Sequence, residues 1–281
     1  MRFRDILLQI DSYPASTPDQ TIEEAVAFAK VLDAELAVLA LQVDIPLSRN
    51  AIAEALIKLG GLERDWEDSC LASCRQAVQR FESAARAAGV FAGAEIHRIN
   101  LLKADDSVAQ RVRARDLCLA AFAERFDEQV EWVKRIIFAS GRPVVVMGGR
   151  PLLAEGRVGD VAVAWDGGRH AARALADALP ILEQARAVRI VTFVNEKVAA
   201  KPGLAAEAAR HLAAHGIHAA VDEIDASDVS IGRAIDTYLA RTPADILVMG
   251  ASGRAPILEF VMGGATDHVL RNVPTALFLS H

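Results

Sequence analysis

The chain of 281 residues is 52% apolar and carries a formal net charge of −6, so it is long enough to bury the core of one large or two modest domains. The negative charge argues against sequence-independent binding of nucleic acid, and no apolar run approaches the roughly twenty residues that a membrane span needs. Because only three cysteines occur and no signal-peptide pattern is present, we expect a soluble, cytoplasmic protein with reduced thiols.

The first half alternates strand-like and helix-like segments. Residues 5–11 (DILLQID) are an apolar run that begins and ends with Asp, which indicates a strand. Further elements are expected in this order: a helix at 21–34, a strand at 35–43, a helix that ends at Gly89 with a strand after it, and strands at 115–122 and 141–147.

The second half repeats this order. Residues 160–166 (DVAVAWD) match residues 5–11, and equivalents of the later elements follow: a helix at 169–185, a strand at 187–194, a helix that ends at Gly216 with a strand after it, and strands at 244–251 and 272–279. Apolar strands that alternate with helices indicate a parallel sheet covered by helices on both faces. We therefore predict the α/β class, with tandem five-stranded domains at 1–150 and 156–281. The joint is expected at 148–160, where Gly and Pro concentrate.

The two halves differ in two places. The first half has a longer stretch between its second strand and Gly89, which includes an extra helix predicted at 49–61. The second half alone has a glycine-rich stretch at 248–271. Its first-half counterpart, 120–143, has no glycine before Gly141 and carries four carboxylates, at Glu124, Asp127, Glu128 and Glu131. Like charges oppose phosphate, so no nucleotide is expected in the first half.

The glycine-rich stretch points to an anion site. Ligands of open parallel sheets bind beyond the carboxyl ends of the strands, and Gly250 closes an apolar strand there. At Gly250 and Gly253 the backbone is expected to adopt positive φ and to come close to a ligand. Gly263 and Gly264 precede a predicted short helix, whose free amides and dipole favour phosphate.

Two side chains complete this expected site. Thr266 adds a hydroxyl beside the phosphates. Asp166 would face the loop if the first and fourth strands of the second half are neighbours, and its carboxylate suits a ribose hydroxyl or an adenine amino group. Capping of the following helix is the alternative role of Asp166.

The pattern Gly250-x2-Gly253-x9-Gly263 resembles the nucleotide-binding branch of the universal stress protein family. No Walker triplet Gly-Lys-Ser/Thr occurs, and no Gly-x-Gly-x-x-Gly follows a first strand. The resemblance covers nearly the whole chain as two copies, with the motif in the second copy only. The family pattern has Ser or Thr after the third glycine, where this chain has Gly264.

The resemblance implies domains that are adenine nucleotide alpha-hydrolase-like, that is Rossmann-like, with ATP bound in the second domain and Mg²⁺ as an optional companion. It assigns Asp166 and Val194 to the adenine, Met249 and Gly250 to the base and ribose, and Gly253, Gly263, Gly264, Ala265 and Thr266 to the phosphates. It also implies a pseudo-dimer within one chain, formed by the last strands of the two halves, with a homodimer as a further option.

No catalytic set and no metal cluster can be recognised from the spacing. The histidines at 211, 215 and 218 are interpreted as a solvated helix end, and ATP hydrolysis is expected to be slow at most. The leading hypothesis is a stress-response regulator or protective factor that binds ATP or a related adenine nucleotide. The alternatives are an interaction module that binds no nucleotide and, with less support, a nucleotide-using enzyme of a related α/β family.

Overall fold

The computed structural model describes residues 2–13, 15–44, 59–100, 106–121, 127–148, 150–194, 203–254 and 261–281. The helix predicted at 49–61 lies outside these ranges except for residues 59–61, which begin a longer helix, α3 (Leu59–Ala88). No helix in the described ranges is both long and apolar enough to span a bilayer.

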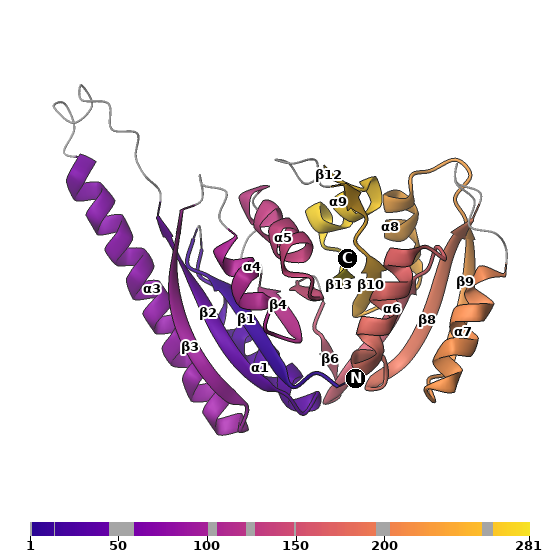
Figure 1. Cartoon of the computed structure of the whole chain (residues 1–281), viewed down its shortest axis with the longest axis horizontal. Coiled ribbons are helices and arrows are strands. Elements are labelled where there is room, and N and C mark those ends of the chain that lie inside the picture. The colour runs from indigo at the N-terminus through magenta and orange to yellow at the C-terminus, as the bar shows by residue number, and fades with distance from the viewer. Residues whose placement is uncertain are drawn as a thin grey trace.

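One sheet of eleven strands runs through both halves of the chain, in the order β3-β2-β1-β4-β5-β13-β10-β7-β8-β9 with β6 paired to β7 (Figure 1). The first half contributes β1 (Asp5–Asp11), β2 (Glu35–Asp44), β3 (Phe91–Asn100), β4 (Leu117–Ala121) and β5 (Val144–Met147). The second half contributes β6 (Leu153–Ala154), β7 (Arg157–Ala164), β8 (Ala185–Val194), β9 (Ala219–Asp225), β10 (Ile246–Gly250) and β13 (Ala276–Ser280). The predicted α/β class with parallel strands in each half is confirmed.

The last strands of the two halves pair with each other. β5 and β13 run antiparallel, with Val145 opposite Phe278, whereas β1, β2, β3, β4 and β5 pair parallel within the first half. β13 also pairs parallel with β10. The edge that each half would otherwise expose is therefore covered by the other half, which removes an open edge strand from the middle of the molecule.

Helices cover both faces of the sheet. The first half contains α1 (Asp19–Val31), α3, α4 (Ser107–Val112) and α5 (Asp127–Ser140), and the second contains α6 (Arg169–Leu182), α7 (Leu204–Ala214), α8 (Ile231–Arg241) and α9 (Gly264–Asn272). Helices α1, α3, α6 and α7 bury Phe28, Phe81, Leu175 and Leu212 against one face. Helices α4, α5, α8 and α9 cover the other. Each such buried side chain contributes about 1.5–3 kcal/mol through the hydrophobic effect.

The duplication is visible in matching hydrogen bonds at the amino ends of the strands. Asp5 N donates to Asp116 Oδ2 at 3.1 Å, and Asp116 N donates to Asp5 O at 2.8 Å. Asp160 N donates to Asp245 Oδ2 at 2.9 Å, and Asp245 N donates to Asp160 O at 2.8 Å. Strand β1 is thus joined to β4 in the same way as β7 is joined to β10.

Two glycines end the equivalent helices, as predicted. Gly89 follows α3 and Gly216 follows α7 by two residues, and both have φ of +77°. Only glycine adopts this left-handed conformation without a steric cost. Strands β3 and β9 begin shortly after them.

The predicted joint at 148–160 contains a β-hairpin. β6 pairs antiparallel with the start of β7, and Glu155 (φ 52°) and Gly156 (φ 76°) form the turn between them. Two successive residues with positive φ are typical of the tight turn that joins antiparallel strands. Strand β7 therefore begins at Arg157, three residues before the predicted start at Asp160.

Candidate nucleotide site

A cavity of about 440 Å³ opens at the carboxyl ends of the strands of the second half. Parallel pairing of β10 with β7 brings their carboxyl ends to the same edge, as predicted for the first and fourth strands. The lining comes from the β7–α6 connection, β8, α8, the end of β10 and the start of α9: Ala164, Trp165, Asp166, Gly168, His170, Ala171, Phe193, Ile231, Ile235, Met249, Gly250, Ser252, Ala265 and Thr266.

Five residues predicted from the sequence line this cavity: Asp166, Met249, Gly250, Ala265 and Thr266. Val194 does not, although it is the last residue of β8. Successive side chains of a strand point to opposite faces, so the preceding residue, Phe193, lines the cavity instead. Gly263 and Gly264 stand directly before the lining residues of α9, and Gly253 lies in β11 (Gly253–Arg254), where it pairs with Met262 of β12 (Val261–Met262).

Gly250 is required by packing and not by positive φ. A Cβ at this position would lie 2.4 Å from the carbonyl carbon of His170 and 2.6 Å from the nitrogen of Ala171. The start of helix α6 therefore sits directly on the end of β10. The expectation that Gly250 adopts positive φ is wrong, because the backbone at Gly250 does not lie in the positive-φ region.

Helix α9 begins where the sequence predicted a helix to open. Gly263 is its N-cap with φ −62° and ψ 144°, and Gly264 is its first residue. Gly263 N donates to Ser252 O at 2.8 Å, which fixes the N-terminus of α9 beside the end of β10. The first amides of a helix have no partner within the helix. In α9 two of these amides belong to Ala265 and Thr266, which line the cavity.

The two glycines at this N-terminus have different surroundings. A Cβ at Gly263 would lie 2.3 Å from Ser252 Oγ, whereas a Cβ at Gly264 would meet no atom within 4 Å. Neither residue has positive φ. The sequence position that carries Ser or Thr in the family pattern is thus sterically open here.

Asp166 does not cap α6, because the N-cap of that helix is Gly168 and no side chain caps it. Asp166 Oδ1 accepts a hydrogen bond from Gly168 N at 2.8 Å, which forms the turn before α6. Its side chain also borders the cavity. One carboxylate oxygen of Asp166 therefore shapes the turn, and the residue also lines the cavity.

Comparison with known proteins agrees with this arrangement. The model of the universal stress protein family matches residues 158–280. The second half of the chain therefore matches this family over nearly its whole length. The match begins in β7 and ends in β13, so it includes each described element that lines the cavity.

The whole chain is similar in fold to solved structures. A universal stress protein from Archaeoglobus fulgidus DSM 4304 has 16% sequence identity and a TM-score of 0.68, over 98% of this chain and 97% of that one. A provisionally named universal stress protein from Pseudomonas aeruginosa UCBPP-PA14 has 14% identity and a TM-score of 0.54, over 99% and 93%. A comparison with curated proteins gave no match. At these low sequence identities, the similarity is evidence for the fold alone.

Several residues that line this cavity were missed from the sequence. Trp165 and Phe193 line the cavity next to the predicted positions Asp166 and Val194, whereas His170 comes from α6, and Ile231 and Ile235 come from helix α8. Ile231 and Ile235 are four residues apart and therefore lie on one face of the helix, so the sequence pattern could have indicated them. Trp165 Nε1 is buried and has no hydrogen-bond partner in the described part of the chain.

His170 links the cavity wall to the end of the sheet. Its ring stacks on His281 with centroids 4.8 Å apart, and His281 Nδ1 donates to Ala251 O at 2.9 Å. Burial lowers the pKa of His170, and the positive charges of His281 and Arg169 lower it further. The neutral imidazole is therefore favoured at this wall.

The equivalent place in the first half holds a buried carboxylate. Asp11 corresponds to Asp166, but it is only 8% exposed and accepts hydrogen bonds from Gln9 Nε2 at 2.5 Å and from Gln129 Nε2 at 2.8 Å. Gln129 is the third residue of α5, as Thr266 is of α9. Burial raises the pKa of Asp11 to about 7. The Asp11 carboxylate is therefore held by β1 and α5, whereas Asp166 is exposed.

The four carboxylates expected to repel phosphate in the first half are only partly described. Glu124 and the side chains of Asp127 and Glu128 lie outside the described residues. Glu131 forms an ion pair with Lys134 at 2.7 Å. The hydrogen bonds that hold the buried Asp11 carboxylate are therefore the described feature that distinguishes the first half from the second.

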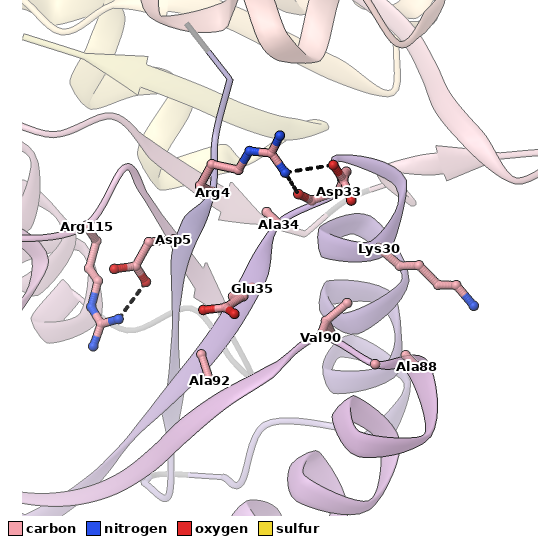
Figure 2. A pocket seen from close by; sticks show the side chains of 11 residues that line it. Arg4, Asp5, Lys30, Asp33, Ala34, Glu35, Ala88, Val90, Ala92 and Arg115 are labelled. Atoms are coloured by element: carbon pink, nitrogen blue, oxygen red, sulfur yellow. Dashed lines mark hydrogen bonds and ion pairs between the residues drawn. The ribbon is translucent and has the colours of Figure 1, made fainter.

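A second cavity, of about 640 Å³, lies at the opposite edge of the sheet (Figure 2). It surrounds the amino ends of β1 and β2, where Arg4 pairs with Asp33 at 2.7 Å and Arg115 pairs with Asp5 at 2.5 Å. Because these charges neutralise one another and ligands of parallel sheets bind at the carboxyl edge, the smaller cavity is the stronger candidate.

Proposed function

We propose that the universal stress protein domain binds ATP or a related adenine nucleotide, one per chain, in the cavity between β7, β10 and α9. The protein then acts as a regulatory or protective factor in a stress response, and not as a metabolic enzyme. The observation that carries this proposal is the N-terminus of α9, whose second and third residues, Ala265 and Thr266, border the same cavity as Asp166.

The phosphates belong at the N-terminus of α9. Free amides and the helix dipole both favour negative charge there, and the Thr266 side chain borders the cavity beside them. A companion Mg²⁺ would take its ligands mainly from phosphate oxygens and water, as Mg²⁺ does in most nucleotide sites.

The base and ribose of the nucleotide belong at the end of the cavity away from the N-terminus of α9. Trp165, Phe193 and Met249 provide apolar and aromatic surface for an adenine ring. The Asp166 carboxylate suits the ribose hydroxyls, because charge-assisted hydrogen bonds are stronger than neutral ones. A volume of about 440 Å³ lies within the usual range for small-molecule sites.

An interaction module without nucleotide is the second candidate. It is favoured by the first half, where Gln9 and Gln129 both hold Asp11. It is also favoured by Gly264, which lacks the hydroxyl that the family pattern has at this position. Under this alternative the cavity of the second half would bind no nucleotide.

The internal repeat supplies a matched pair of variants to separate these candidates. Asp166→Asn keeps an oxygen that can accept from Gly168 N, so the turn is retained while the charge is lost. Asp11→Asn makes the same change in the first half. We expect Asp166→Asn to weaken ATP binding about 5- to 10-fold by calorimetry and Asp11→Asn to leave it unchanged. Equal ATP affinity of both variants and wild type would contradict the proposed site.

A further inference from the structure

A buried lysine of the first half contacts the helix that opens the nucleotide site of the second half. Lys134 belongs to α5, and its side chain is 6% exposed. Its Nζ lies 2.8 Å from Asp267 Oδ1 on α9 and 2.7 Å from Glu131 Oε1 on its own helix. Figure 1 shows α5 and α9 side by side where the halves meet.

Asp267 lies in the first turn of α9, three residues after Gly264. Both of its carboxylate oxygens are occupied, since Oδ1 accepts from Lys134 Nζ and Oδ2 accepts from Arg271 Nε at 2.8 Å. The charges of Glu131, Lys134, Asp267 and Arg271 cancel. The phosphate end of the site is therefore free of net charge from this cluster.

Both central groups are ionised at neutral pH. Burial disfavours the charged Lys134, but hydrogen bonds to Asp267 and Glu131 and their charges outweigh burial and raise its pKa. Burial also disfavours the charged Asp267, but hydrogen bonds from Arg271 and Lys134 outweigh this and lower its pKa. The contact is an ion pair that is only partly shielded from water, because the Lys134 side chain is 6% exposed whereas that of Asp267 is 32% exposed.

The same face of α5 reaches the site a second time. Phe138 lies one turn after Lys134, and its ring meets the His281 ring edge-on with centroids 4.7 Å apart. His281 in turn stacks on His170 in the cavity wall. Helix α5 thus contacts the phosphate side of the cavity through α9 and another wall through two aromatic rings.

We propose that Lys134 of the first half is a positioning residue that sets the phosphate affinity of the nucleotide site in the second half. The inference rests on the proposed function, because it concerns the same site. Lys134 does not line the cavity. It acts through Asp267, which would otherwise be paired with Arg271 alone, and the cluster with Glu131 would then carry a net negative charge close to the amides that receive phosphate.

Reciprocal coupling is a consequence. If α5 holds α9 in its binding position, a bound nucleotide must hold α5 as well. Amide hydrogen exchange of α5 should therefore slow when ATP is added, although α5 belongs to the half that binds no nucleotide.

The test compares ATP with adenosine, which lacks phosphate, in four proteins: wild type, Lys134→Met, Asp267→Asn and the double variant. We expect Lys134→Met to weaken ATP about 5- to 30-fold and adenosine less than twofold. Asp267→Asn should bind ATP as tightly as wild type or tighter. The double variant should recover to within about threefold of wild type. Lys30→Met, at the amino edge of the sheet, is the control for loss of a positive charge and should bind ATP as wild type does.

The outcomes separate the two proposals. A wild-type protein that binds neither ATP nor adenosine would refute the proposed function. If wild type binds ATP and Lys134→Met binds it equally well, the role of Lys134 is refuted and the site stands. Equal losses for ATP and adenosine would show lost packing instead of a charge effect. If thermal melting shows that Lys134→Met does not fold, the test rests on Asp267→Asn. ATP binding as tight as in wild type or tighter would then support the inference, and weaker ATP binding in that variant would overturn it.

Discussion

Gln129 Nε2 donates a hydrogen bond to Asp11 Oδ2 over 2.8 Å, which joins α5 to the end of β1. At the equivalent place in the second half, Thr266 and Asp166 border a cavity. The two copies have kept one fold, including the reciprocal contacts of Asp5 with Asp116. They have diverged at the edge where a ligand would bind.

Replacement of Asp11 by Asn should change how stability depends on pH. Burial raises the pKa of Asp11 to about 7, above its value near 3.8 in an unfolded chain. Between these values the folded protein keeps a proton that the unfolded chain releases, so this group favours folding at low pH and loses its contribution as pH rises towards 7. The total loss is about 4 kcal/mol at most.

The measurement is denaturant unfolding of wild type and Asp11→Asn at pH 5 and pH 8. The variant should gain stability relative to wild type at pH 8, because Asn carries no charge to bury. Asp166→Asn is the control, since Asp166 is exposed. An identical change with pH in wild type and Asp11→Asn would show that Asp11 does not titrate in this range.

A methyl group at Gly250 should destabilise the fold. The Cβ of Gly250→Ala would lie 2.4 Å from a backbone carbon of α6, so strand β10 and α6 must move apart. Overpacking of this kind costs about 1–3 kcal/mol. Gly264→Ala is the matched control, because its Cβ would meet open space. Chemical denaturation should therefore distinguish the two, and equal stabilities would mean that the contact relaxes without cost.

Gly264→Ser should strengthen ATP binding. The position has room for a side chain and does not need positive φ, and serine would supply a hydroxyl beside the phosphates. One neutral hydrogen bond contributes about 0.5–1.5 kcal/mol, which corresponds to a gain of roughly 2- to 12-fold in affinity. Titration calorimetry measures the change, and weaker binding would mean that the serine side chain obstructs the phosphate.

Gly263→Val should weaken ATP binding. Its Cβ would lie 2.3 Å from Ser252 Oγ, and Ser252 lines the cavity. A shift of Ser252 or of the start of α9 would disturb the phosphate end, with an expected loss of about tenfold. Thermal melting checks that the variant folds. A folded Gly263→Val protein with wild-type affinity would mean that Gly263 serves the turn alone.

Local signals in the sequence predicted much of the fold. The repeated Asp-led strands and the glycines at 89 and 216 gave the order of elements, because strand period and helix termination depend on neighbouring residues. The hairpin at β6 was missed, since a run rich in Gly and Pro resembles a linker until its pairing is known. Strand β7 accordingly begins earlier than predicted.

The site was harder to predict because its geometry depends on distant elements. The glycine spacing located the N-terminus of α9, and the family resemblance that rests on it, together with the strand end at Asp166, gave five of the lining residues. It gave the wrong reason for Gly250, whose close neighbour is helix α6, about eighty residues earlier. The ion pair of Lys134 with Asp267 joins two halves of the chain, and no local pattern contains such a contact.

The stoichiometry of ATP binding tests the central claim most directly. The second half has a cavity bordered by Asp166 and the start of α9, whereas Asp11 in the first half is enclosed by Gln9 and Gln129. Calorimetric titration of the full chain with ATP should give one nucleotide per chain. A value near two would show that the first half also binds, and no binding at all would leave the interaction module as the function of this chain.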